Sequence, residues 1–167
     1  MLEVTNNVPV HKGDVFFIES GTLHAIGKGI LIAEIQQNSN TTYRVYDYGR
    51  VGKDGKPREL HIEKAIDVTE LCPPKYDTKP QGKPVKIDGG EETLLRSCEY
   101  FDVHKIKVSG TVTLDADEKS FMSVLVLDGS GKIGELDAKK GDSFFVPAGY
   151  GRFTLTGNLE VILSDIV

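Results

Sequence analysis

"KGDVFFIESGTLHAIG", residues 12–27, recurs in altered form as "KGDSFFVPAGYGRFTL", residues 140–155. At a constant offset the two copies share Lys-Gly-Asp, a Phe pair and a later glycine. The Gly-Asp pair is typical of a tight turn, the aromatic pair followed by a β-branched residue is typical of a buried strand, and the later glycine indicates a second turn. A unit of this kind that occurs twice predicts two related β modules.

The rest of the chain extends this pattern, because short runs rich in Val, Ile, Phe and Tyr alternate with Gly, Pro, Asn and Asp. Such runs predict short strands joined by tight turns, here at residues 15–18, 30–36, 42–48, 123–127, 143–146 and 159–167. Only residues 58–71 have the apolar spacing of a helix. Residues 73–90 are rich in proline and poor in large apolar side chains, which is typical of a linker or an extended crossing segment.

The duplicated turn–strand–turn unit resembles the cupin motif, a small antiparallel barrel or jelly roll. The predicted fold is therefore all-β, with one partial and one near-complete cupin-like unit and a short helix between them. We expect residues 1–62 to be the carboxy-terminal part of a catalytic cupin and residues 63–90 to be the helix and linker. Residues 91–167 are then a second cupin-like barrel without a metal site.

Composition limits the class of protein. The chain has 167 residues, of which 39% are hydrophobic and 27% charged, so a packed core is expected. A net charge of −5 argues against a basic surface for nucleic acid, and no apolar run is long enough to span a bilayer. The first ten residues lack the charged and apolar regions of a signal peptide, so a cytoplasmic location is expected. Cys72 and Cys98 have no metal-site or disulfide spacing.

His24 is the first candidate site residue. A lone histidine among apolar neighbours is more often a satisfied core or rim residue than a metal ligand. In the second copy, however, Arg152 occupies the matching position, so the copies share their scaffold residues and differ at the one position that could hold a metal. Imidazole binds divalent metals well and the mouths of β-barrels are common ligand sites, which favours the ligand interpretation.

Residues 16–50, followed by "GKPRELHIEKA" at 55–65, closely resemble type I mannose-6-phosphate isomerases, which are zinc-dependent cupin enzymes. The resemblance runs from about residue 11 to the end of the chain. It implies that His24, in its "GTLHA" context, is a zinc ligand, and that Arg44, after "EIQQNSNTTY", is the catalytic arginine. It also implies that Glu34 lines the substrate cavity. From the residues alone, Arg44 and Glu34 would be interpreted as solvated strand residues.

The chain also departs from the family pattern. The family's other zinc ligands, a Gln-x-His pair and a Glu, belong to an amino-terminal half that this sequence does not contain. The chain is therefore expected to be the carboxy-terminal portion of the enzyme, with weak zinc binding on its own.

Two hypotheses remain open. The first is a zinc-dependent isomerase, or part of one, that interconverts mannose 6-phosphate and fructose 6-phosphate. The second is a non-catalytic cupin module with a sugar-binding or regulatory role. The expected partner is a small sugar phosphate, with no nucleic acid and no membrane. A homo-oligomer built through exposed strand edges is also expected, because unpaired edges favour association with another chain.

Overall fold

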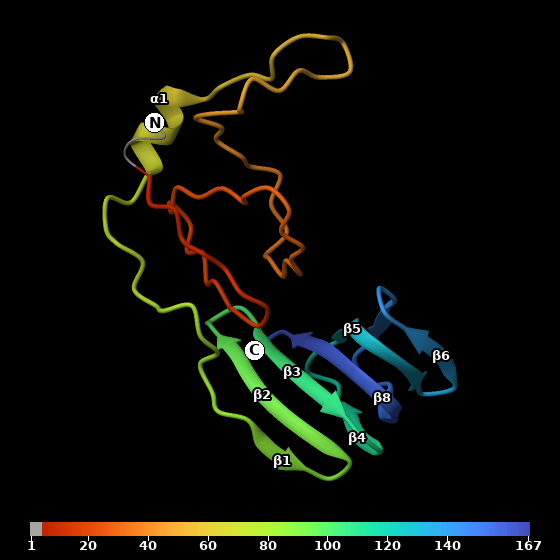
Figure 1. The fold of residues 1–167 in the computed structure, drawn as a ribbon. Helices are drawn as coiled ribbons and strands as arrows, with labels where there is room; N and C mark the ends of the chain where they lie inside the picture. Colours follow the sequence, from red (N-terminus) through yellow and green to blue (C-terminus); the bar gives the residue numbers. More distant parts are fainter. Residues whose placement is uncertain (1–4) are drawn as a thin grey trace. The chain divides into compact units, whose positions relative to one another are not determined.

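The computed structural model describes residues 5–167. The chain divides into two compact units, Met1–Asp77 and Thr78–Val167, which are described separately below as unit 1 and unit 2. Figure 1 shows that the strands belong to unit 2, whereas unit 1 contains one short helix and long connecting segments.

Unit 2 is a single antiparallel sheet of eight strands. The strands are β1 (Val85–Ile87), β2 (Gly90–Ser97), β3 (Asp102–Val108), β4 (Thr111–Ala116), β5 (Met122–Ile133), β6 (Leu136–Lys139), β7 (Ser143–Val146) and β8 (Gly151–Asp165). They run in the order β1-β2-β3-β8-β5-β6, while β4 also pairs with β8 and β7 with β5.

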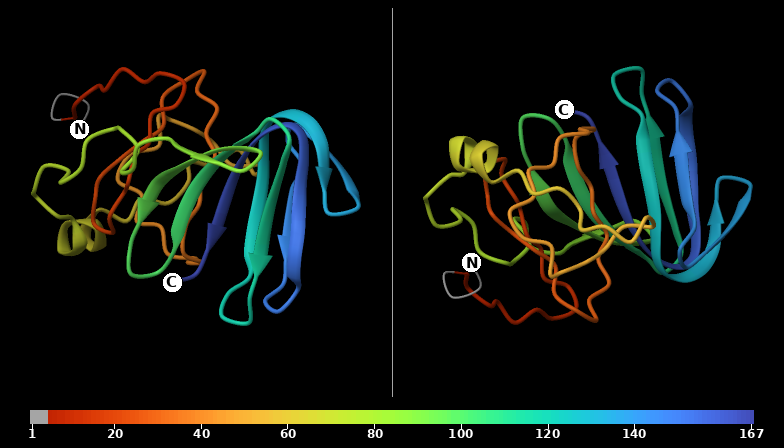
Figure 2. Two further views of the ribbon diagram at one scale, coloured as in Figure 1. Left: turned by 90° about the horizontal axis from the view of Figure 1, so that it is seen from below. Right: turned by 90° about the horizontal axis from the view of Figure 1, so that it is seen from above.

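The long strand β8 makes the sheet curl. Its first part pairs with β4 and its second part with β3, while β5 follows it along the other edge. Figure 2 shows the resulting curvature within unit 2. Where the partner changes, Gly131 of β5 lies opposite Gly157 of β8. A Cβ on Gly131 would lie 1.9 Å from the carbonyl oxygen of Thr156, so the strands can approach this closely only because the residue is glycine.

The inner face of this curved sheet is the hydrophobic core. Along β3, β5 and β8, successive side chains point to opposite faces of the sheet, and directly paired residues of neighbouring strands share a face. The largest fully buried side chains are Ile106, Leu155, Val108, Val124, Val126 and Val161. Burying one such side chain stabilises the fold by roughly 1.5–3 kcal/mol, so this layer provides most of the driving force for folding unit 2.

The all-β class predicted from the sequence is confirmed. In unit 2 the strands lie close to the predicted ranges. Residues 143–146 are β7, residues 123–127 lie within β5, and residues 159–165 belong to β8. Strand β1 was missed, because residues 73–90 were interpreted as a linker or an extended segment. It pairs with β2 across Asp88 and Gly89, a dipeptide typical of a two-residue hairpin turn.

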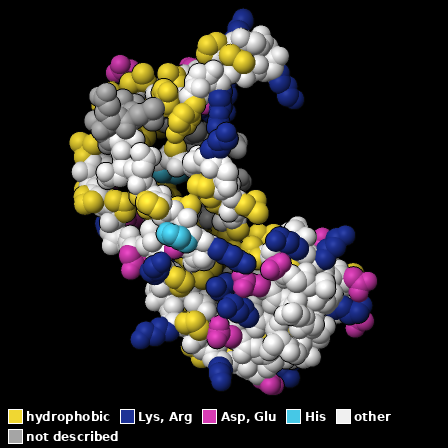
Figure 3. Space-filling model, in the orientation of Figure 1, with side chains coloured by type: hydrophobic (Ala, Val, Ile, Leu, Met, Phe, Trp, Pro, Cys, Tyr) yellow, Lys and Arg dark blue, Asp and Glu magenta, His cyan; other side chains and the backbone are white. Residues whose placement is uncertain are grey.

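Unit 1 differs from the prediction. The strands predicted at 15–18, 30–36 and 42–48 are absent as regular strands, and an isolated bridge joins Val51 to Pro57. A strand persists only when a neighbouring strand satisfies its backbone groups, and within the described part of unit 1 these segments have no such neighbour. Figure 3 shows many apolar side chains on the surface of this unit. Among them, Leu31 is 91% exposed.

The predicted helix is present but short. Helix α1 spans Ile62–Val68, inside the predicted range of 58–71. It begins soon after Pro57 and ends at Thr69, whose backbone is extended. Cys72, just beyond the helix, is followed by two prolines, and a residue before proline is driven out of the helical region, so the helix does not continue into this segment. Across residues 5–167, no helix has the length and apolar character needed to cross a membrane.

Candidate functional site

His24 lies in unit 1, just after a tight turn in which the N–H of Thr22 donates to the carbonyl of Glu19. Its imidazole is exposed, and Nδ1 lies 2.8 Å from the carbonyl oxygen of Thr22. Because a carbonyl can only accept, Nδ1 carries the proton in this contact and the Nε2 lone pair stays available. This arrangement, with one ring nitrogen held by the backbone, is the one that metal-binding histidines commonly use.

Arg152, the matching residue of the second copy, lies in a different environment. It is on β8, its side chain is 82% exposed, and its Nε is 3.7 Å from a carboxylate oxygen of Asp115 on β4. This is a solvated cross-strand ion pair, which contributes little to stability. The two matching positions therefore differ in surroundings as well as in residue type, since Arg152 is ion-paired on a strand and His24 follows a tight turn.

Arg44 is held by its neighbours. Its side chain is only 24% exposed, Nη1 donates to the carbonyl of Glu59 at 3.2 Å, and Nε lies 3.8 Å from a carboxylate oxygen of Asp47. The backbone of the same residue is paired with His61, whose N–H donates to the Arg44 carbonyl at 2.7 Å and whose Nδ1 accepts from the Arg44 N–H at 3.2 Å. Arg44 is thus a positioned guanidinium rather than a freely solvated one.

Asp47 links Arg44 to a second arginine. Arg58 grips both carboxylate oxygens of Asp47, with Nε at 2.7 Å from one and Nη2 against the other. The hydrogen bond from Arg58 holds the pKa of Asp47 below its usual value, and the charge of Arg44 acts in the same direction. The same hydrogen bond raises the pKa of Arg58. Asp47 and Arg58 therefore stay charged at neutral pH, and the Asp47 carboxylate lies between the side chains of Arg58 and Arg44.

Glu34 is exposed. Within residues 5–167, no hydrogen bond or ion pair joins Glu34 to His24 or Arg44. The described residues also contain no group of three or more His, Cys, Asp or Glu side chains that could hold a metal ion.

The sequence analysis did not identify Asp47, Arg58 or His61 as members of the candidate site. A signal for this cluster was present in the turn-forming stretch 52–56. There the N–H of Gly52 donates to the carbonyl of Lys56 at 2.7 Å, beside the bridge that joins Val51 to Pro57. A tight turn at that place brings the flanking segments side by side, which is how Arg44 meets residues 58–61.

Comparisons with known proteins agree on one family. Residues 90–166 match the family model described as "Mannose-6-phosphate isomerase, cupin domain". The chain is 43% identical to mannose-6-phosphate isomerase ManA of Bacillus subtilis over 98% of its own length and 52% of that protein. It is 40% identical to the mannose-6-phosphate isomerase of Streptococcus mutans over 94% of its own length and 50% of that protein. The chain thus spans about half the length of the curated relatives it matches.

Structural comparison gives the same answer. The crystal structure of mannose 6-phosphate isomerase from Bacillus subtilis matches with a TM-score of 0.66 and 36% identity, over 77% of this chain and 41% of that one. The matches in sequence extend through both units, whereas the family model covers the curled sheet of unit 2. Residues 90–166 thus match the cupin domain of mannose-6-phosphate isomerases, and nearly the whole chain is similar to a part of these enzymes.

Proposed function

We propose that this chain forms part of a zinc-dependent isomerase that interconverts mannose 6-phosphate and fructose 6-phosphate. In this proposal Arg44 is the catalytic residue, Glu34 contacts the substrate and His24 is one zinc ligand. The observation that carries the proposal is the fixed guanidinium of Arg44, which is partly buried and anchored on one side by Asp47 and Glu59. The names of the relatives that cover nearly the whole chain support the choice of reaction.

The isomerisation moves a proton between C1 and C2 of the sugar and passes through an enediolate, whose oxygens carry negative charge. A guanidinium has five N–H donors, and Arg44 directs one of them to the carbonyl of Glu59 and another toward Asp47. The remaining donors are free to stabilise the developing charge or to hold the phosphate. Prior anchoring means that the side chain does not have to reorganise during the reaction, which is the basis of electrostatic catalysis.

Zinc fits His24 but not the described residues as a set. The imidazole offers Nε2 while Nδ1 is held by Thr22. A catalytic zinc site needs three protein ligands, and residues 5–167 contain no three-ligand group. Zinc, when bound, would act as a Lewis acid on the sugar oxygens. In this proposal its other ligands come from outside the described residues.

The decisive experiment measures isomerase activity with added zinc in two samples. One contains the chain alone, and the other contains the chain mixed with the amino-terminal part of the Bacillus subtilis relative that lies outside the matched region. We expect activity only in the mixture. Arg44→Ala should then lower kcat by about a hundredfold or more, since it removes a charge contact to the transition state. Lysine should not restore the rate if the contact is bidentate.

A matched control is provided by Arg152→Ala, which removes the same residue type from the second copy and should leave the rate of the mixture unchanged. His24→Ala should reduce zinc stoichiometry and activity together, whereas His11→Ala, a change at another exposed histidine, should affect neither. Equal loss of zinc and activity in Arg44→Ala would show that Arg44 is a structural residue, and full activity of the chain alone would overturn the proposal.

One observation favours a second candidate, a non-catalytic module that binds a sugar or regulates. Because the described residues lack a three-ligand metal group, the chain alone is suited to binding rather than turnover. Binding of mannose 6-phosphate by the chain, with no activity in any mixture, would support this candidate. A cytoplasmic location and a homo-oligomer through strand edges remain predictions, and sedimentation over a wide concentration range would test the latter.

A further inference from the structure

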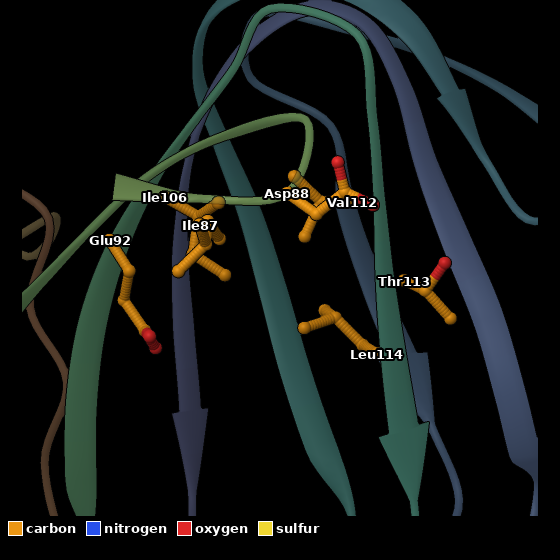
Figure 4. A pocket seen from close by; sticks show the side chains of 7 residues that line it. All are labelled: Ile87, Asp88, Glu92, Ile106, Val112, Thr113 and Leu114. Carbon is orange, nitrogen blue, oxygen red and sulfur yellow. The ribbon is translucent and has the colours of Figure 1, made fainter. Parts of the chain in front are cut away.

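Unit 2 contains a cleft that is lined only by residues of this unit. It has a volume of about 250 Å³ and lies between the β1–β2–β3 side of the sheet and strand β4. Figure 4 shows the side chains that line it, which are Ile87, Asp88, Glu92, Ile106, Val112, Thr113 and Leu114. Pockets for drug-sized ligands are usually about 300–1,000 Å³, so this cleft suits a smaller molecule.

The walls of the cleft combine apolar and polar side chains. Ile106 and Val112 belong to the buried core, and Ile87 and Leu114 pack against it. Glu92 is in register with Ile106 on the neighbouring strand, and directly paired residues share a face of the sheet, so its side chain is on the inner face. Figure 4 shows Glu92 and Leu114 on facing sides of the same space. A half-buried carboxylate therefore faces apolar side chains across the cleft.

The carboxylate of Glu92 is supported from one side. His104 lies two residues before Ile106 on β3 and faces the same side of the sheet. Its Nδ1 is 2.9 Å from Oε1 of Glu92. This distance makes an ion pair when the imidazole is protonated, while the angles are not those of a hydrogen bond. The contact thus leaves hydrogen-bonding capacity on the carboxylate, which can accept from a group inside the cleft.

Charge selects the ligand class. The two ionisable residues that line the cleft, Asp88 and Glu92, are both acidic, and no lysine or arginine lines it. Phosphates and carboxylates are therefore repelled. An ammonium group donates a hydrogen bond in which both partners are charged, and it therefore gains a Coulomb attraction to the carboxylate that a neutral hydroxyl lacks. We propose that this cleft binds a small organic cation, with its ammonium on Glu92 and a short carbon frame against Ile106, Val112 and Leu114.

The test titrates the full chain with n-butylammonium and with 1-butanol, a neutral molecule of similar shape, and follows binding by calorimetry and by NMR shifts of β2 and β4. Glucosamine and glucose form a second matched pair, which distinguishes a sugar frame from a hydrocarbon one. We expect each ammonium compound to bind more tightly than its neutral counterpart. Glu92→Gln should weaken ammonium binding by about ten- to a hundredfold, as expected for losing a hydrogen bond between charged groups.

Glu91→Gln is the matched control. Glu91 precedes Glu92 on β2, so its side chain points to the opposite face of the sheet, where its Oε1 is 3.9 Å from Nζ of Lys107. This variant therefore removes the same charge outside the cleft. It should leave affinity nearly unchanged, and Asp88→Asn should give a smaller loss than Glu92→Gln. Equal binding of ammonium and neutral partners, or equal effects of Glu91→Gln and Glu92→Gln, would overturn the proposal. None of these measurements depends on isomerase activity, so the outcome is independent of the proposed function.

Discussion

The two copies of the Lys-Gly-Asp turn have the same local structure and different surroundings. In unit 1 the N–H of Asp14 donates to the carbonyl of His11 at 3.1 Å, and the Asp14 carboxylate accepts from the His11 N–H at 2.8 Å. In unit 2 the corresponding bonds between Asp142 and Lys139 are 3.0 and 2.9 Å. The central glycine of each turn is left-handed, with φ values of 95° and 91°.

Beyond the turn the two copies diverge. Phe144 and Phe145 lie on β7 and pair with β5, whereas Phe16 and Phe17 belong to no strand. The same contrast holds for burial, since Ala65 is the only fully buried apolar residue in the described part of unit 1. Turn chemistry is thus encoded within a few residues, but strand and core formation require partners far away in the chain.

The largest expected effect is a difference between two leucines. Leu155 is 0% exposed in the core of unit 2, and Leu31 is 91% exposed in unit 1. Leu155→Ala should lower the free energy of unfolding by about 2–5 kcal/mol, because it removes buried contacts and leaves a cavity. Leu31→Ala should change it by no more than about 0.5 kcal/mol. Urea unfolding measures both, and similar losses would show that unit 1 has a core of its own.

A smaller effect is expected at the duplicated turn. Gly13 and Gly141 share a left-handed conformation, and in both a Cβ would meet open space, so alanine introduces the same backbone strain of roughly 1–2 kcal/mol. Gly141→Ala should lower the unfolding midpoint of the sheet. Gly13→Ala should not, because its turn is outside that cooperative unit. A matching fall in both variants would contradict the separation of the two units.

The smallest effect concerns two aspartates whose pKa values shift in opposite directions. Burial raises the pKa of Asp165 at the end of β8, with the nearby His104 opposing the shift and Asp102 adding to it. The folded state therefore favours its protonated form. This contribution is complete below the pKa of the unfolded chain, about 3.9, and is lost as the pH rises through the folded value.

Asp165→Asn removes this unfavourable charge and should raise the unfolding midpoint at pH 7. The rise should be smaller than the fall caused by Gly141→Ala, and it should disappear near pH 3. Asp47→Asn is the comparison in unit 1, where the hydrogen bond from Arg58 lowers the pKa instead. Its stabilising contribution is present above the unfolded pKa and is lost as the pH falls through the folded value. Because that contribution is local to unit 1, the midpoint of the sheet should not change at either pH. A gain from Asp165→Asn that persists at pH 3 would exclude burial of the charge as its cause.

The sequence predicted what depends on local signals. The Gly-Asp turns, the Phe pair of β7 and the alternating apolar residues of β8 are all visible within short windows. Strand β1 was not predicted, because a strand of three residues between a proline and a hairpin turn is too short to show an alternating apolar pattern. The segments 30–36 and 42–48 have strand-like composition, but composition does not supply the neighbouring backbone that a strand must bond to.

The candidate site likewise contains residues that the sequence could indicate and residues that only the folded chain brings together. His24, Glu34 and Arg44 were predicted mainly from the resemblance to a family, because their own sequence neighbourhoods also fit ordinary surface residues. The Arg44–Asp47–Arg58 cluster was not predicted, because the stretch 52–56 indicates a turn but not which side chains meet across it. Similarly, the contact between Glu92 and His104 arises from the register of β2 and β3.

Amide hydrogen exchange tests the central claim most directly, which is that unit 2 is a cooperative fold while the site-bearing segments of unit 1 lack strand partners. In the chain alone, amides of β3, β5 and β8 should exchange slowly, at rates set by global unfolding, and amides of residues 30–48 should exchange rapidly. Adding the amino-terminal part of the Bacillus subtilis relative should slow exchange in residues 30–48 and leave the sheet unchanged. Slow exchange of residues 30–48 in the chain alone, equal to that of β3, β5 and β8, would contradict the claim.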